Sequence, residues 1–79
     1  MAIHAYTWTK PYHGVSHLNH ESRSFRQVTI ARYDSFVQAM VFGPVGSGFE
    51  PIAEKTFYGE TMEADAMAWC EKQADALDH

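Results

Sequence analysis

The segment that decides the fold is FRQVTIARYDSFVQAMVF, residues 25–42 of the 79-residue chain. It contains two apolar runs, 25–33 and 36–42, separated by Asp34 and Ser35, which are residue types typical of tight turns. Two such runs joined by so short a turn predict a β-hairpin. The second run is apolar on both of its faces, which is typical of a strand inside a sheet rather than at its edge.

Two further strands are predicted, one on each side of this hairpin along the chain. Residues 3–10 alternate with period two, and Pro11 is expected to end this first strand. Residues 52–58 form the other strand, in which the charged Glu54 and Lys55 indicate a position nearer the sheet edge.

The connections are predicted to be long. Residues 11–24 are rich in Gly, His, Ser and Asn and show little periodicity, so we expect a loop of about fourteen residues, which is longer than usual. Residues 43–51 contain three glycines and two prolines and predict a flexible connection between strands. This glycine loop lacks the Lys-Ser/Thr ending of a phosphate-binding loop, and no helix can follow it directly.

Residues 61–77 predict a C-terminal amphipathic helix. Thr61 is a suitable N-cap, and Glu63 in the first turn suits the positive end of the helix dipole. A core-facing arc of about 100° is expected to contain Met62, Ala66, Trp69, Cys70, Gln73 and Leu77. The fold class is therefore α+β, with a small antiparallel sheet of three to four strands, one C-terminal helix packed on one face (ββββα), and a single domain over residues 1–79.

Negative charge is concentrated at the C-terminal end. Residues 50–79 hold eight of the ten acidic residues and two lysines, which makes −6, against +2 for residues 1–49. Glu71, Asp75 and Asp78 are predicted to lie together on the far side of the helix, away from its apolar face. We interpret these three, supported by Glu63 and Asp65, as partner-binding residues that attract a basic protein surface. The alternative is an ordinary solvated helix face.

A second candidate site is the histidine cluster in the predicted loop. His13, His17 and His20, followed by Glu21, are suitable ligands for zinc, nickel or copper. Gly14 disfavours the helical turn that would bring them onto one face. The alternative is a loop that holds histidines without binding a metal.

The aromatic residues of the first strand allow two placements. His4, Tyr6 and Trp8 share one face of this strand. Their rings either pack under the helix or lie on the open side of the sheet as protein contacts, where they would make a homodimer easy to form.

No motif supports catalysis, so the chain is not expected to be an enzyme, and no cofactor is expected. Cys70, the single cysteine, is expected to be a buried and inert free thiol. One cysteine and an N-terminus without the features of a signal peptide fit a reducing, intracellular compartment, so a cytoplasmic location is expected. A net charge of −4 argues against direct nucleic-acid binding, and no apolar run is long enough to cross a membrane.

The stretch FYGETMEADAMAWCE, residues 57–71, resembles the strand–turn–helix ending of small phage proteins of the anti-CRISPR type. This resemblance covers the C-terminal architecture and carries no individual functional residue. It implies an inhibitor that docks on a basic nucleic-acid-binding surface of a CRISPR effector and blocks DNA binding. Residues 59–64, GETMEA, are also similar to a segment of HicB-like antitoxins, although the order of acidic and apolar residues then departs from that family. The leading hypothesis is thus a non-enzymatic protein-binding module, with a metal-binding protein or an antitoxin as alternatives.

Overall fold

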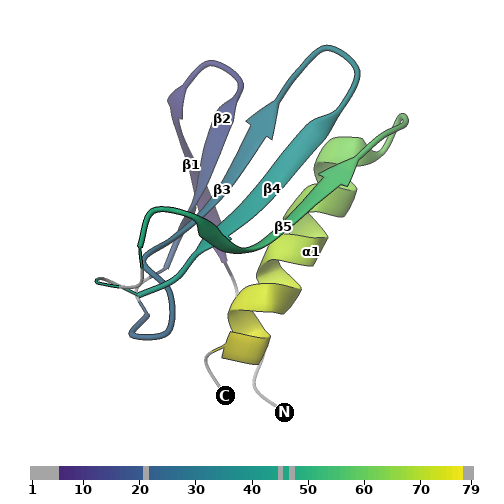
Figure 1. The fold of residues 1–79 in the computed structure, drawn as a ribbon. Helices are drawn as coiled ribbons and strands as arrows, with labels where there is room; N and C mark the ends of the chain where they lie inside the picture. The colour runs from purple at the N-terminus through teal and green to yellow at the C-terminus, as the bar shows by residue number, and fades with distance from the viewer. Residues whose placement is uncertain (1–5, 21, 45, 47, 78–79) are drawn as a thin grey trace.

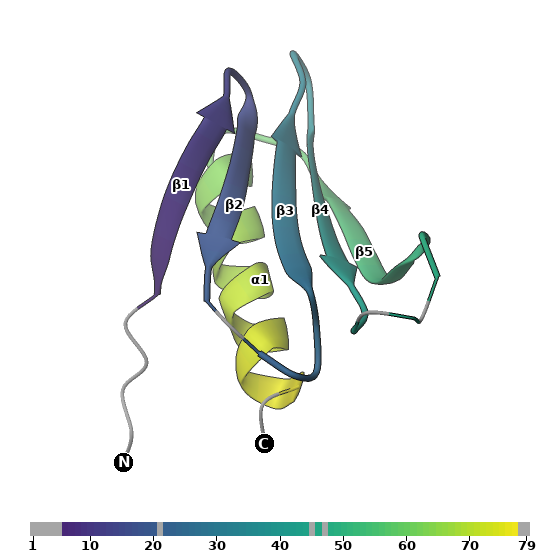
Figure 2. The ribbon, with the colours of Figure 1, turned by 90° about the vertical axis from the view of Figure 1, so that its left-hand side faces the viewer.

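The computed structural model describes residues 6–20, 22–44, 46 and 48–77. Within these residues the chain forms five strands and one helix (Figure 1). They are β1 (Thr7–Tyr12), β2 (Val15–Asn19), β3 (Gln27–Arg32), β4 (Val37–Phe42), β5 (Pro51–Phe57) and α1 (Met62–Leu77). The strands pair antiparallel in the order in which they occur in the sequence, and α1 lies behind one face of the sheet in Figure 2.

The predicted central hairpin is confirmed. Strands β3 and β4 pair from Gln27↔Phe42 to Arg32↔Val37, and the Tyr33 N–H donates to the Phe36 carbonyl at 2.9 Å to close the turn. Alternate side chains of the two strands are buried at no more than 2% exposure, and these are Val28, Ile30, Val37, Ala39 and Val41. They form the sheet side of the hydrophobic core.

The prediction of a loop over residues 11–24 was wrong. Strand β1 continues through Pro11 to Tyr12, and residues 15–19 form β2, so the sheet has five strands rather than three to four. Pro11 is tolerated because β1 is an edge strand, where a missing N–H need not break a ladder bond. The turn consists of two residues, and Gly14 supplies the positive φ of 77° that such a turn requires. Of the predicted first strand, residues 3–5 lie outside the described residues.

The helix is confirmed and packs on β3, β4 and β5. Its closest contacts are made by small side chains, since Ala66, Cys70 and Ala74 are fully buried, while Met62 and Trp69 pack beside them. Small side chains at this line allow the helix to lie close to the sheet. Burial, with a smaller contribution from the neighbouring carboxylate of Glu71, raises the pKa of Cys70 to about 12, which agrees with the prediction of an inert thiol. No helix in the described part of the chain is long and apolar enough to span a membrane.

Candidate partner-binding surface

The acidic side of α1 faces strand β1 instead of solvent. The Trp8 indole N–H donates to Glu71 Oε2 at 3.0 Å, and the Tyr6 hydroxyl donates to Asp75. Two residues of extended chain and four residues of a helix both advance about 6–7 Å, so Tyr6, just before β1, and Trp8 in β1 meet successive helical turns. Buried Trp and Tyr side chains need partners for their polar atoms, and the two carboxylates supply them.

The prediction that Glu71 and Asp75 lie on the far side of the helix was therefore wrong. Both are half-buried, and the outer face of the helix is formed by Ala64, Asp65, Ala68, Lys72 and Ala76. The helical arc alone could not reveal this, because the donors come from a strand more than sixty residues earlier in the chain. Packing of Tyr6 and Trp8 against the core also decides between the two placements of these rings, and they lie on the helix side.

The other predicted contact residues lie at the start of the helix. Glu63 Oε2 is 3.2 Å from Arg32 Nη1, and Glu63 Oε1 is 3.9 Å from Lys10 Nζ. Asp65 is exposed and accepts a hydrogen bond from the Thr61 hydroxyl at 2.9 Å. Asp78 lies outside the described residues. A role for any of these acids in partner binding stays a prediction, but Glu63, Glu71 and Asp75 already have partners within the fold.

The three histidines have separate environments. His13 is exposed in the β1–β2 turn, and His17 Nδ1 is 2.9 Å from Gln27 Nε2. The His20 ring lies between Tyr6 and Phe25, at 5.2 and 5.9 Å between ring centroids. Among the described residues, no three His, Cys, Asp or Glu side chains form a group that could hold a metal ion, and Glu21 lies outside these residues.

The face of the sheet opposite α1 is covered by no other element in the described part of the chain (Figure 2). One row of paired residues crosses all five strands on this face: Thr9, His17, Thr29, Met40 and Glu54. Thr29, in the middle of the row, is only 9% exposed because its neighbours shield it. The central row of this face is thus largely polar, with Met40 as its one apolar member.

Exposed aromatic rings gather at one end of the same face. Tyr33 and Phe36 stack at 4.7 Å between ring centroids, and Tyr58 lies 6.1 Å from Phe36. Continuing the strand alternation by one residue places these rings on the uncovered side, beyond Ala31, Gln38 and Thr56. Tyr33 and Tyr58 are 50% and 70% exposed, and Phe36 between them is half-buried.

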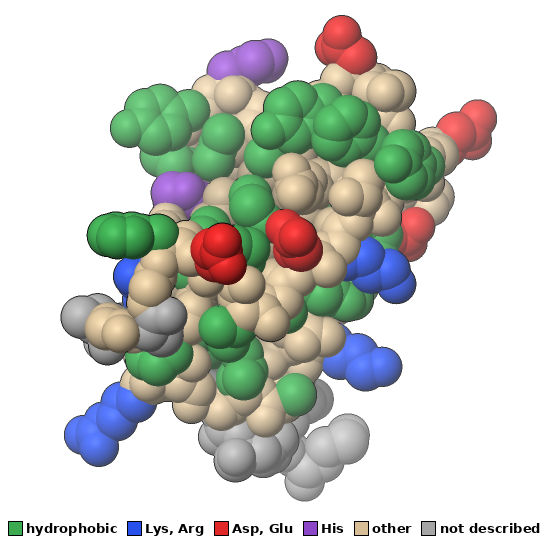
Figure 3. All heavy atoms as spheres, viewed as in Figure 1, with side chains coloured by type: hydrophobic (Ala, Val, Ile, Leu, Met, Phe, Trp, Pro, Cys, Tyr) green, Lys and Arg blue, Asp and Glu red, His purple; other side chains and the backbone are tan. Residues whose placement is uncertain are grey.

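Three acidic residues lie near these rings in the chain or on the same face of the sheet. Asp34 lies in the same turn, Glu54 is on the same side of β5, and Glu60 follows Tyr58 by two residues. Together with the three rings they form what we call the acidic aromatic patch: Tyr33, Asp34, Phe36, Glu54, Tyr58 and Glu60. In Figure 3, hydrophobic side chains collect at the upper end of the visible face, with acidic side chains around them and Lys and Arg lower down.

The charge of the patch is not neutralised internally. The salt bridges found in the described part of the chain join Lys10 and Arg32 to Glu63, and none reaches the three acids of the patch. The sequence analysis missed this site, although the aromatic residues on both sides of the predicted Asp34-Ser35 turn were a signal that could have pointed to it.

Comparisons with protein families, with curated proteins and with solved structures find no match. The function therefore has to be inferred from the surface itself.

Proposed function

We propose that the protein is a non-enzymatic binding module that docks the acidic aromatic patch on a basic surface of a partner protein. The observation that carries this proposal is the three-ring cluster on the uncovered sheet face, in which Tyr33 and Tyr58 are exposed, together with Asp34, Glu54 and Glu60, which no salt bridge in the described part of the chain reaches. Tyrosine and other aromatic residues are enriched among the residues that contribute most to binding at interfaces.

Charge complementarity favours a basic partner over a second copy of this chain. The chain has a net charge of −4, and the patch adds like charges to like charges if two copies meet there. On a basic surface the same carboxylates accelerate association and fix the orientation, while the rings supply the apolar contact. Binding of a second copy at this patch, which would form a homodimer, is thus less favoured than binding of a basic partner.

The resemblance of residues 57–71 to proteins of the anti-CRISPR type suggests which basic surface to test first. A groove that binds nucleic acid is lined by Lys and Arg, so an acidic module that occupies it competes with DNA. We therefore propose the DNA-binding surface of a CRISPR effector as the first partner to examine, in the cytoplasm of a host cell.

The experiment measures DNA binding by purified CRISPR effector complexes in the presence of increasing amounts of the full chain. The triple variant Asp34→Lys, Glu54→Lys, Glu60→Lys is expected to lose inhibition by more than about tenfold, since close charge pairs across interfaces contribute ~1.5 kcal/mol or more. Glu50→Lys, an exposed acid outside the patch, serves as the control for charge reversal. Equal inhibition by the wild type and the triple variant would show that the patch is not the contact.

A second set of variants tests the acidic side of the helix separately. Lysine at Glu71 or Asp75 would disrupt the contacts with Trp8 and Tyr6, so a loss of binding could reflect a disturbed fold. Glu71→Gln and Asp75→Asn remove the charge but retain an oxygen acceptor. If these variants keep their melting temperature and lose the partner, the helix and not the patch makes the contact.

A further inference from the structure

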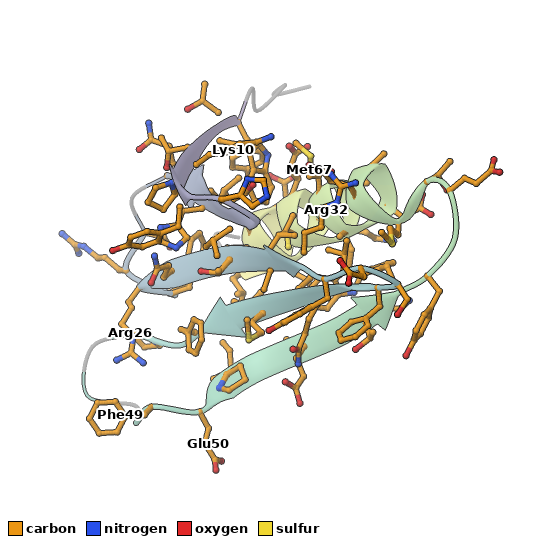
Figure 4. All side chains as sticks on the ribbon, turned by 90° about the horizontal axis from the view of Figure 1, so that it is seen from above. Lys10, Arg26, Arg32, Phe49, Glu50 and Met67 are labelled. Carbon is orange, nitrogen blue, oxygen red and sulfur yellow. The ribbon has the colours of Figure 1, made fainter. Side chains whose placement is uncertain are left out.

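A cleft of about 800 Å³ opens between the tip of the β1–β2 hairpin, the end of β3 and the start of α1. Seven of the residues that line it have a charged, histidine or aromatic side chain: Lys10, Tyr12, His13, Arg32, Tyr33, Asp34 and Glu63. In Figure 4, Lys10 and Arg32 lie beside each other where β1 approaches the helix, on the same side as Met67. The two cations belong to different strands, and the fold brings them to one carboxylate.

The Glu63 carboxylate is the negative charge that pairs with both cations of this cleft. Its two oxygens lie 3.2 Å from Arg32 Nη1 and 3.9 Å from Lys10 Nζ. The side chains of Arg32 and Lys10 are 60% and 73% exposed, so most of their donors still face solvent. The site therefore holds one carboxylate between two cations that remain accessible from solvent, so another anion can compete for them.

We propose that this cleft binds a phosphate monoester, whose phosphate displaces the Glu63 carboxylate from Lys10 and Arg32. A phosphate monoester carries a charge of about −1.5 to −2 at pH 7, so it competes favourably with a single carboxylate. The guanidinium fork of Arg32 matches phosphate oxygens in pairs, and Lys10 adds a compact second charge. The adjacent N-terminus of α1 contributes a positive dipole end to the same location.

The rim of the cleft determines what can be attached to the phosphate. Tyr12 is 72% exposed at the hairpin tip and offers a ring on which a flat group can stack. Asp34 also lines the cleft. Its negative charge repels a phosphate, so we expect binding to need the attraction of both Lys10 and Arg32. A nucleoside monophosphate and a simple sugar or glycerol phosphate share this chemistry and differ in their use of Tyr12.

This inference does not rest on the proposed function. The cleft and the acidic aromatic patch share Tyr33 and Asp34, but Lys10 and Arg32 line the cleft alone. Glu54 and Glu60 belong to the patch and do not line the cleft. Variants at these four unshared positions therefore test the two proposals separately.

The test is an NMR titration of the full chain at low salt with inorganic phosphate, glycerol phosphate and adenosine monophosphate. Arg32→Gln and Lys10→Gln are each expected to weaken binding about tenfold, and Glu63→Gln to tighten it by a similar factor, because hydrogen bonds to charged groups are gained or lost. Arg26→Gln and Glu50→Gln remove the same charges outside the cleft and are expected to leave affinity unchanged. Saturable shifts around residues 10–16 with this pattern support the proposal.

Tighter binding of the nucleotide than of glycerol phosphate, with the difference lost in Tyr12→Ala, assigns a nucleotide; equal binding assigns the phosphate group alone. The proposal is overturned if none of the three probes gives a saturable shift. It is equally overturned if Arg32→Gln and Arg26→Gln bind the probes alike, or if Glu63→Gln fails to tighten binding while its melting temperature matches that of the wild type.

Discussion

Helix α1 is held to the sheet along two lines that use different interactions. Over β3–β5 the contact is apolar and made by Ala66, Cys70 and Ala74, all fully buried; we call this line the apolar seam. Toward β1 the contact is polar, with Asp75 and Glu71 accepting hydrogen bonds from a tyrosine and a tryptophan; this line, which ends at the Glu63 ion pairs, is the polar seam.

The difference between the seams shows what each one determines. Small side chains in the apolar seam set how close the helix lies to the sheet, and burial of apolar area is the main source of stability there. Directional hydrogen bonds in the polar seam instead fix the position of β1, an edge strand, relative to the helix. Acidic residues in such a seam stabilise the fold. A count of acidic residues in the sequence therefore does not tell how much negative charge the surface offers to a partner.

The largest effect is expected from enlarging a side chain in the apolar seam. Ala66→Leu adds methylene groups where no space exists, and overpacking of this kind should lower the free energy of unfolding by about 3 kcal/mol. Ala68→Leu, on the exposed side of the same helix, is the matched control and should change it by less than about 0.5 kcal/mol. Chemical denaturation of both variants measures the difference, and similar values would mean that the apolar seam is not tightly packed.

The next largest effect is expected at alkaline pH and also belongs to the apolar seam. Burial raises the pKa of Cys70 from 9.0 to about 12, so the folded protein retains a proton that the unfolded chain loses. The contribution of this thiol is complete below pH 9 and is lost as pH rises from about 9 toward 12. Wild type and Cys70→Ala, compared by denaturation at pH 8 and pH 10, should differ in their pH slope, with the steeper decrease in the wild type. Equal slopes would contradict a buried, protonated thiol.

Two of the three residues of the apolar seam, Ala66 and Cys70, were in the predicted core-facing arc, whereas Ala74 and the polar seam were not predicted. Helical periodicity and the central hairpin depend on near neighbours in the chain, so Cys70 and the run 25–42 could be placed from residue order alone. Strand β2 escaped prediction because Leu18 is its single buried side chain and its pairing is decided by β1 and β3.

The candidate site was harder to predict than the fold for the same physical reason. Glu71 looks like a free surface acid unless one knows that Trp8 lies beside it. Tyr33 and Tyr58 were not singled out, because their place on the uncovered face follows from the strand register. Both cases depend on contacts between segments that are distant in sequence, which periodicity does not report.

A smaller effect is expected in the middle of the polar seam. Tyr6→Phe removes the hydroxyl that donates to Asp75 and should lower the free energy of unfolding by about 1 kcal/mol, since a half-buried acceptor loses its donor. Tyr12→Phe, at the exposed hairpin tip, provides a control in which the same atom is removed with little effect. A double-mutant cycle with Asp75→Asn isolates the pair, and a coupling energy near zero would mean that this hydrogen bond does not hold β1.

The smallest effect is expected where the polar seam reaches solvent. Lys10 and Glu63 are 73% and 37% exposed and 3.9 Å apart, and ion pairs of this kind contribute only a few tenths of a kcal/mol. Lys10→Gln should therefore be as stable as Lys72→Gln, which removes the same charge from the outer face of the helix, when both are measured by denaturation at low salt. If Lys10→Gln instead costs about 1 kcal/mol, as expected for Tyr6→Phe, the ion pairs stabilise β1 as much as the hydrogen bonds do. If the two lysine variants are equally stable, the polar seam is stabilised mainly by the hydrogen bonds of its two aromatic donors. Lys10 is then not needed for the fold and can bind an anion.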